Sequence, residues 1–261
     1  MRRIPIVLTA AVLGVIAWGV IPAAADDLED ARTIVTAKAN TVKKWQYPPR
    51  FVIVHDQPVD RAAFGEVTDF IVATTGLAIE QPTFINLTDA GFDPRFYTAS
   101  RYSPRKTEEG RMTSDLLIAL KEDMELSANI FVFMVSPRLA SHFIALTDYG
   151  RFSGSLTRGY VQGNGPCYFK VLSNSESIQF GTILIAPSID ADMQRACIYE
   201  EMVQAMGLMN DAQDSPFFTF DNLVADKPRD YDQRLLAALY DPRIRNGDAV
   251  DKVLDIYTAL R

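Results

Sequence analysis

The sequence predicts an α+β fold in which helices pack against a mixed β-sheet. Short apolar runs typical of buried strands occur at four places along the chain. Segments with helical spacing of apolar residues precede, separate and follow them, and the last part of the chain contains only helical patterns. With 48% hydrophobic residues, the chain can bury a core of its own.

The predicted elements run in the order strand, helix, strand, strand, strand and helix, with one helix before and two small helices after. The helices are predicted at residues 28–45, 61–75, 190–206, 231–240 and 249–260. The strands are predicted at residues 50–55, 78–87, 129–135 and 182–186. We expect a single domain over residues 26–261, with an N-terminal helix (28–45), a sheet-plus-helix half (46–210) and a helical C-terminal part (211–261).

The first residues have the pattern of an export signal. Arg2 and Arg3 give a positive start, residues 4–22 are apolar, and the small residues 23–25 precede two aspartates. We therefore expect residues 1–25 to be a signal peptide cleaved after Ala25, and the mature chain to be periplasmic or secreted. The alternative is an uncleaved N-terminal membrane anchor, because the apolar stretch nearly spans a bilayer.

The charge of the mature chain limits its partners. The whole chain has a formal net charge of −7, and loss of the signal removes two arginines and no acidic residue. The more negative mature chain is a poor match for nucleic acid and for anionic membrane surfaces. We therefore expect neither nucleic acid nor, after signal cleavage, a membrane as a partner.

The two cysteines, Cys167 and Cys197, are expected to form a disulfide. An exported chain enters an oxidising compartment, where two lone cysteines usually pair. The bridge would stabilise the fold by about 3–4 kcal/mol in the chain-entropy model, and its Cα atoms should lie within roughly 7 Å. Two unpaired buried thiols are the alternative.

The segment that begins at Glu200 has the spacing of a zinc-protease helix, in which H-E-x-x-H is followed by x-x-G-x-x-H or x-x-G-x-x-D. Glu200 and Gln204 stand where the two histidines belong. Glu201 keeps the position of the general base. Residues 200, 204 and 207 share one helix face, opposite an apolar stripe, so Glu200, Gln204, Asn210 and Asp211 are candidates to face a cleft or solvent.

The residues at these positions suit zinc poorly. Zinc prefers imidazole or thiolate ligands, whereas carboxylate and amide oxygens suit harder ions such as calcium or magnesium. The only histidines, His55 and His142, are not in a paired spacing, and both cysteines are expected in the disulfide. We therefore predict no cofactor and no zinc, with a hard divalent ion as the alternative.

The run C-I-Y-E-E-M-V-Q-A-M-G-L-M-N-D, followed by S-P-F-F-T-F-D-N and D-Q-R-L-L-A-A-L-Y-D-P-R-I, resembles an exported proteobacterial family catalogued as domain of unknown function 2927. The resemblance covers roughly residues 45–247. It implies a zincin-like fold with E-E-x-x-Q in place of H-E-x-x-H, and the cysteine pair also matches it. Residues 246–248, Asn-Gly-Asp, depart from an expected Pro-Gly-Met type of turn. The family has no established activity to carry over.

Three functions are compatible with these patterns. The first is an exported zincin-like pseudoenzyme that binds an unknown envelope protein, peptide or glycan. The second is a metal-dependent hydrolase with an oxygen-ligand site, in which Glu201 would be the base. In that hydrolase the ion would be held by Glu200, Gln204, and Asn210 or Asp211. The third is a structural envelope module in which the helix is merely amphipathic.

Overall fold

The computed structural model describes residues 26–89, 129–136, 139, 165–175, 177–212 and 228–261. The expected signal peptide, residues 1–25, lies outside these described residues, and so does His142. Among the described helices, none has the length and apolar character needed to cross a membrane.

Five described strands form one sheet in the order β2–β1–β3–β5–β4. Strand β1 (Phe51–His55) pairs in parallel with β2 (Thr83–Asn86) and with β3 (Ile130–Met134). Strand β5 (Ile178–Ile185) pairs in parallel with β3, and β4 (Cys167–Ser173) pairs antiparallel to β5. The sheet is therefore mixed, and the predicted α+β class is confirmed.

Three strands differ from the prediction by more than one residue at an end, and β5 is one of them because it begins at Ile178 and not at the predicted residue 182. Strand β4 was not predicted, although it becomes the edge of the sheet beside β5. Strand β2 is shorter than the predicted 78–87 and begins after Pro82. Proline lacks the N–H group that a ladder bond needs, so the pairing with β1 begins at Thr83.

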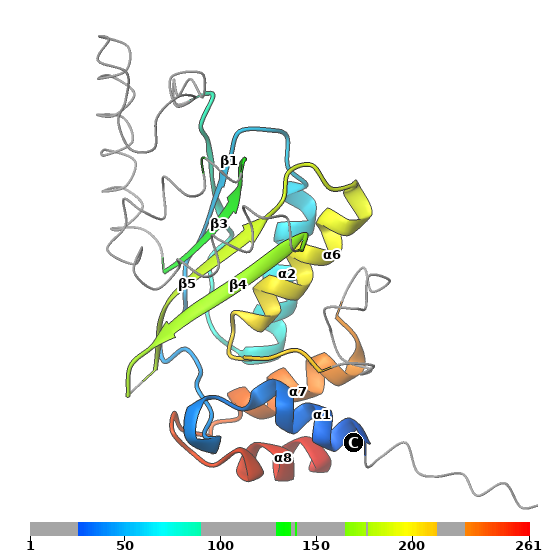
Figure 1. The fold of residues 1–261 in the computed structure, drawn as a ribbon. Coiled ribbons are helices and arrows are strands. Elements are labelled where there is room, and N and C mark those ends of the chain that lie inside the picture. Colours follow the sequence, from blue (N-terminus) through cyan, green and yellow to red (C-terminus); the bar gives the residue numbers. More distant parts are fainter. Residues whose placement is uncertain (1–25, 90–128, 137–138, 140–164, 176, 213–227) are drawn as a thin grey trace, which may run out of the picture.

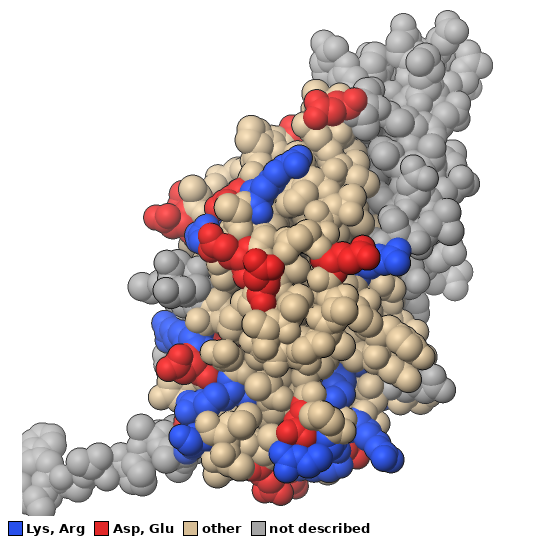
Figure 2. Space-filling view, turned by 180° about the vertical axis from the view of Figure 1, so that it is seen from behind, with Lys and Arg blue, Asp and Glu red and all other residues tan. Residues whose placement is uncertain are grey.

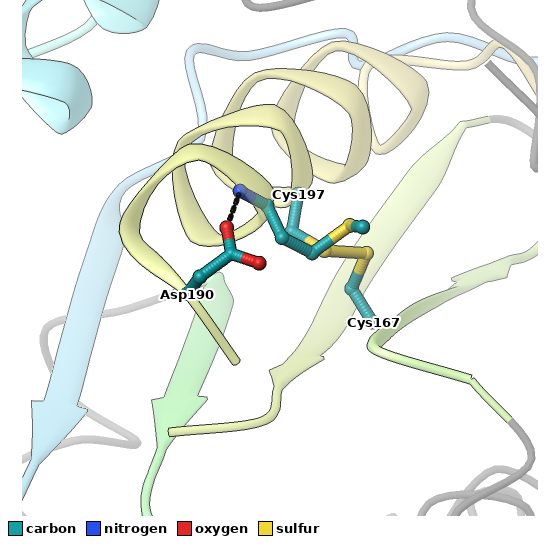
Figure 3. The surroundings of a disulfide bond; sticks show 4 residues. Cys167, Asp190 and Cys197 are labelled. Carbon is teal, nitrogen blue, oxygen red and sulfur yellow. Dashed lines mark hydrogen bonds between the residues drawn. A yellow bond between two sulfur atoms is a disulfide. The ribbon is translucent and has the colours of Figure 1, made fainter. Parts of the chain in front are cut away.

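Two helices cover one face of the sheet (Figure 1). Helix α2 (Arg61–Thr75) has the predicted bounds, because the Asp60 carboxylate accepts a hydrogen bond from the Ala63 N–H and Gly76, at φ +71°, ends the helix. Helix α6 (Ala191–Gln204) begins in the same way, with the Asp190 carboxylate accepting from the N–H of Met193 (Figure 3). Nearby residues thus encode the starts of both helices and the end of α2.

The sheet has a buried apolar layer on each face. Ile53, Val132 and Ile183 belong to the larger core cluster, together with residues of α2 and α6. The alternate residues of the same strands form a second cluster, which includes Val52, Phe131 and Leu184. Since successive side chains of a strand point to opposite faces, continuous apolar runs are what a sheet buried on both faces requires.

The remaining helices, α1 (Asp26–Val35), α7 (Asp230–Tyr240) and α8 (Val250–Ala259), lie together at one end of the molecule (Figure 1). The N-terminal helix was predicted at 28–45, but α1 ends at Val35 and a short 3-10 turn, η1 (Lys38–Asn40), follows it. Ala39 and Asn40 have positive φ angles of 59° and 56°, which end helical propagation.

The turn after α1 has a clear role in packing. It redirects the chain so that Val42 and Trp45 become buried. The indole N–H of Trp45 donates to the carbonyl of Ala205 at 2.9 Å, just beyond the end of α6. Tertiary contacts of residues 41–45 thus replace the helix that their spacing predicted.

Acidic and basic side chains are interspersed over the described face in Figure 2. More of the lysines and arginines of that face lie in its lower part, where α1, α7 and α8 pack together. This distribution resembles an ordinary solvated surface more than a single basic patch.

Candidate functional site

The disulfide joins Cys167 at the start of β4 to Cys197 in α6, with the two Cα atoms 5.8 Å apart (Figure 3). The predicted pairing is confirmed, and the spacing is typical of a disulfide. The bridge connects the edge of the sheet to the helix that carries the protease-like motif. It therefore fixes the two walls of the space between them.

A hollow of about 130 Å³ lies between β4 and α6. Strand β4 contributes Tyr168 and Phe169 to its lining, α6 contributes Glu200, Glu201 and Gln204, and the segment after α6 contributes Asp211. Four of the five residues that the sequence singled out for a cleft or a base thus line one space.

Asn210 has a different place. Its side-chain amide donates to the carbonyls of Thr33 and Thr36, both at 2.8 Å. These carbonyls belong to the end of α1 and the residue that follows it, where a helix leaves acceptors without helical partners. Asn210 therefore caps α1 from a distant part of the chain and is not part of the hollow's lining.

Helix α6 is covered on more sides than its amphipathic pattern suggested. Glu201 is 5% exposed and Gln204 3% exposed, so neither side chain faces solvent. Helix α2 packs against one flank of α6 and β4 against another. The α2 flank is fastened by Arg195, which pairs with Asp60 at 3.1 Å and with Glu66. The solvent-facing alternative for Gln204 is therefore wrong.

Burial gives the two adjacent glutamates unusual acid–base properties. Burial, with the negative charges of Asp211 and Asp232 adding to it, raises the pKa of Glu200 to about 8. Burial, followed by the charges of Glu200 and Asp211, raises the pKa of Glu201 well above its usual range. Both glutamates therefore keep their protons to a higher pH than exposed glutamates do.

One oxygen of this pair stands out. Oε2 of Glu201 is buried and has no hydrogen-bond partner among the described residues. A buried polar atom without a partner costs about 1–3 kcal/mol, so folds rarely retain one without a reason. By contrast, the amide of Gln204 donates a hydrogen bond to the Asp211 carboxylate.

The residues of the hollow do not fit a zinc site. Both cysteines are in the disulfide, and His55 lies at the end of β1 with Nδ1 2.8 Å from the Gln57 carbonyl. Within the described ranges, no group of three or more His, Cys, Asp or Glu is arranged to hold a metal ion. We therefore derive no metal-dependent step for this site.

Sequence reasoning missed the β4 wall of the hollow. Tyr168 and Phe169 line it, and burial followed by the charge of Glu201 raises the pKa of Tyr168. The local signal was the weak apolar pattern of residues 167–173, C-Y-F-K-V-L-S, which follows Pro166 and is interrupted by Lys170.

The family described as "Protein of unknown function (DUF2927)" matches residues 25–259. The chain belongs to this family. The DUF2927 match extends from α1 to α8 and so includes both walls of the hollow, and the predicted family resemblance is confirmed. No curated protein and no solved structure matches the chain.

Proposed function

We propose that this chain is an exported, zincin-like protein without peptidase activity that binds an extended segment of an envelope protein along β4 and α6. One observation carries the proposal. The frame of a zinc-protease helix is filled by Glu200, Glu201 and Gln204, and these side chains line a hollow beside an edge strand. Because this frame has no imidazole ligands for zinc, binding is a simpler function for it than metal-dependent hydrolysis.

The edge strand supplies the main-chain part of the proposed binding. The N–H of Ala186 donates to the carbonyl of Pro166 at 2.8 Å, one pair beyond Cys167 and Ile185. In an antiparallel ladder, hydrogen-bonded and non-hydrogen-bonded pairs alternate. The N–H and C=O groups of Cys167, Phe169 and Val171 therefore point away from β5.

No described strand pairs with this outer edge of β4. A row of outward N–H and C=O groups is what a peptide uses when it adds a strand to a sheet. The hollow lies next to the same strand and could receive a side chain of the added segment. This arrangement favours a polypeptide over a glycan as the ligand.

The chemistry of Glu201 favours binding over hydrolysis. A general base in a zinc protease acts on a metal-bound water, and the present residues do not fit zinc. The export part of the proposal rests on the signal-like residues 1–25 and on the disulfide, which is typical of oxidising compartments.

Peptidase activity tests the non-catalytic part. Purified protein is incubated with casein and a mixed peptide library, with zinc, calcium or magnesium added in separate reactions. We expect no cleavage. Metal-dependent cleavage that is abolished by Glu201→Gln would overturn the proposal in favour of a hydrolase with oxygen ligands.

Selection from a random-peptide display library tests the binding part. We expect enriched peptides to bind Val171→Pro at least about tenfold more weakly than the native protein, since proline removes one outward N–H donor. Val171→Ala is the matched control, because it shortens the same side chain but keeps the N–H group. A library that yields no binders would favour a purely structural role, whereas binders insensitive to Val171→Pro would contradict binding along β4.

A further inference from the structure

We propose that the hollow beside α6 takes one positively charged group, a lysine ammonium or an arginine guanidinium, which contacts the carboxyl groups of Glu200 and Glu201. The source of that group, a side chain of the bound segment, rests on the proposed function. The charge preference itself rests on the geometry of the hollow alone.

The carboxyl groups around the hollow can carry only negative charge. Glu200, Glu201 and Asp211 line it, and the charge of Asp232 on α7 also acts on Glu200. Among the described lining residues, none is lysine, arginine or histidine. An opposite charge placed among these carboxyl groups would stabilise their ionised forms.

The buried oxygen of Glu201 gives a second and independent reason. Glu201 is 5% exposed, lines the hollow, and has Oε2 without a partner among the described residues. A donor from a ligand would satisfy this oxygen, and a charged donor forms the stronger hydrogen bond with a carboxylate. Ammonium and guanidinium groups carry only donors, so they match an acceptor-lined space.

The size of the hollow suits a single charged group. Its volume of about 130 Å³ exceeds the roughly 10–15 Å³ that one water molecule needs. The nearest basic residue on the same helix, Arg195, already pairs with Asp60 and Glu66 on α2. Arg195 is therefore engaged elsewhere and does not supply the cation for the hollow.

Binding of the cation should release a proton. Burial raises the pKa of Glu200 to about 8 and that of Glu201 well above its usual range, so a cation that favours the ionised forms should displace a proton. The other ionisable groups facing the pair are Tyr168 on β4, Asp211 after α6 and Asp232 on α7. None of these groups is a base that could balance the cation's charge, so affinity should fall as the pH is lowered and the carboxyl groups of the pair take up protons.

Small probes test the charge preference without the unidentified segment. Titration calorimetry is run with n-butylammonium and n-butylguanidinium, with neutral butyramide as the matched probe. Two buffers of different ionisation enthalpy reveal proton release. We expect saturable binding of both cations with proton release, weaker binding at pH 5 than at pH 8, and no binding of butyramide.

Variants locate the site. We expect Glu201→Gln to lower the affinity for both cations by about tenfold or more. Glu200→Gln, in a less buried position, should act in the same direction and provides the test if Glu201→Gln does not fold. The matched control is Glu80→Gln, an exposed glutamate outside the hollow, which should bind as the native protein does.

Two results separate this inference from the proposed function. Selected peptides that depend on the β4 edge but show no preference for lysine or arginine, with neither cation bound, would overturn the inference and leave the proposed function standing. Cation binding that depends on Glu201, with no peptide binding at all, would support the inference and overturn the proposed function.

Discussion

Two regions around the C-terminal part of α6 differ in whether their buried polar groups have hydrogen-bond partners. Beyond its C-terminal end, the Trp45 indole donates to the Ala205 carbonyl at 2.9 Å, and the Tyr240 hydroxyl donates to the Met206 carbonyl at 2.8 Å. Along its β4 flank, the buried Oε2 of Glu201 has no partner among the described residues. We call these regions the junction and the hollow.

The junction contributes to stability, whereas the hollow has the features of a functional site. Every polar group named at the junction has a partner, so burial there costs little and the packing stabilises the fold. The hollow places adjacent carboxyl groups in a poorly solvated space, which costs stability in the free protein. A fold that retains such a cost next to an otherwise well-satisfied core is typical of a binding or catalytic site.

The largest effect is expected from breaking the junction at Gly207. This residue has φ +122°, and an added Cβ would overlap the carbonyl oxygen of Lys43. Gly207→Ala should lower the free energy of unfolding by about 3 kcal/mol or more, because strain and overlap act together. Denaturant unfolding followed by circular dichroism measures the change.

The matched control for this variant is Gly247→Ala. Gly247 also has a positive φ, +84°, but an added Cβ would meet nothing within 4 Å. Its cost should therefore be the conformational strain alone, about 1–2 kcal/mol. Equal losses for the two variants would mean that contact with Lys43 does not matter.

The disulfide comes next, since it fixes the hollow and contributes to stability at once. The loop between Cys167 and Cys197 spans 30 residues, so the Cys167→Ser, Cys197→Ser double variant should lose about 3–4 kcal/mol. The melting temperature of the oxidised, reduced and double-variant proteins measures it. If reduction left the melting temperature unchanged, the bridge would contribute nothing to the stability of the native fold.

The smallest effect, and the most specific, concerns pH. A glutamate whose pKa is raised in the folded state favours folding while it is protonated, and this advantage is lost as the pH rises. For Glu200 the loss should run from about pH 4.5 to about pH 8.

Replacing the partner glutamate tests this pH dependence. Glu201→Gln should match the native stability near pH 4 and exceed it by about 1–3 kcal/mol near pH 8, because the amide never ionises. Chemical denaturation at a series of pH values measures the difference. A variant that is less stable than the native protein at every pH would show that the carboxyl of Glu201 is satisfied in solution.

Much of the scaffold could be predicted from local patterns. Helix α2 has the predicted bounds because Asp60 and Gly76 encode its ends in adjacent residues. Strand β1 is one residue shorter than predicted at its start and β3 one residue shorter at each end, since a continuous apolar run marks a strand buried on both faces. The disulfide was predicted from compartment chemistry and needed no geometry.

Other features depended on distant contacts. The predicted helix of residues 28–45 stops at Val35, where the Asn210 side chain and the Met209 N–H bind the carbonyls around its end. Strand β4 was missed, because an edge strand with a lysine in its middle has only a weak apolar pattern.

By itself, the sequence determined the α+β class, the capped helices, the disulfide and the helix frame, in which Glu200 and Gln204 stand in place of two histidines and Glu201 keeps the place of the base. Only the tertiary structure decided that these side chains are buried beside β4 and that Asn210 caps α1 instead. The physical reason is that helical periodicity shows which residues share a face. Whether that face meets water or another element depends on how the sheet edge and the helices pack around it.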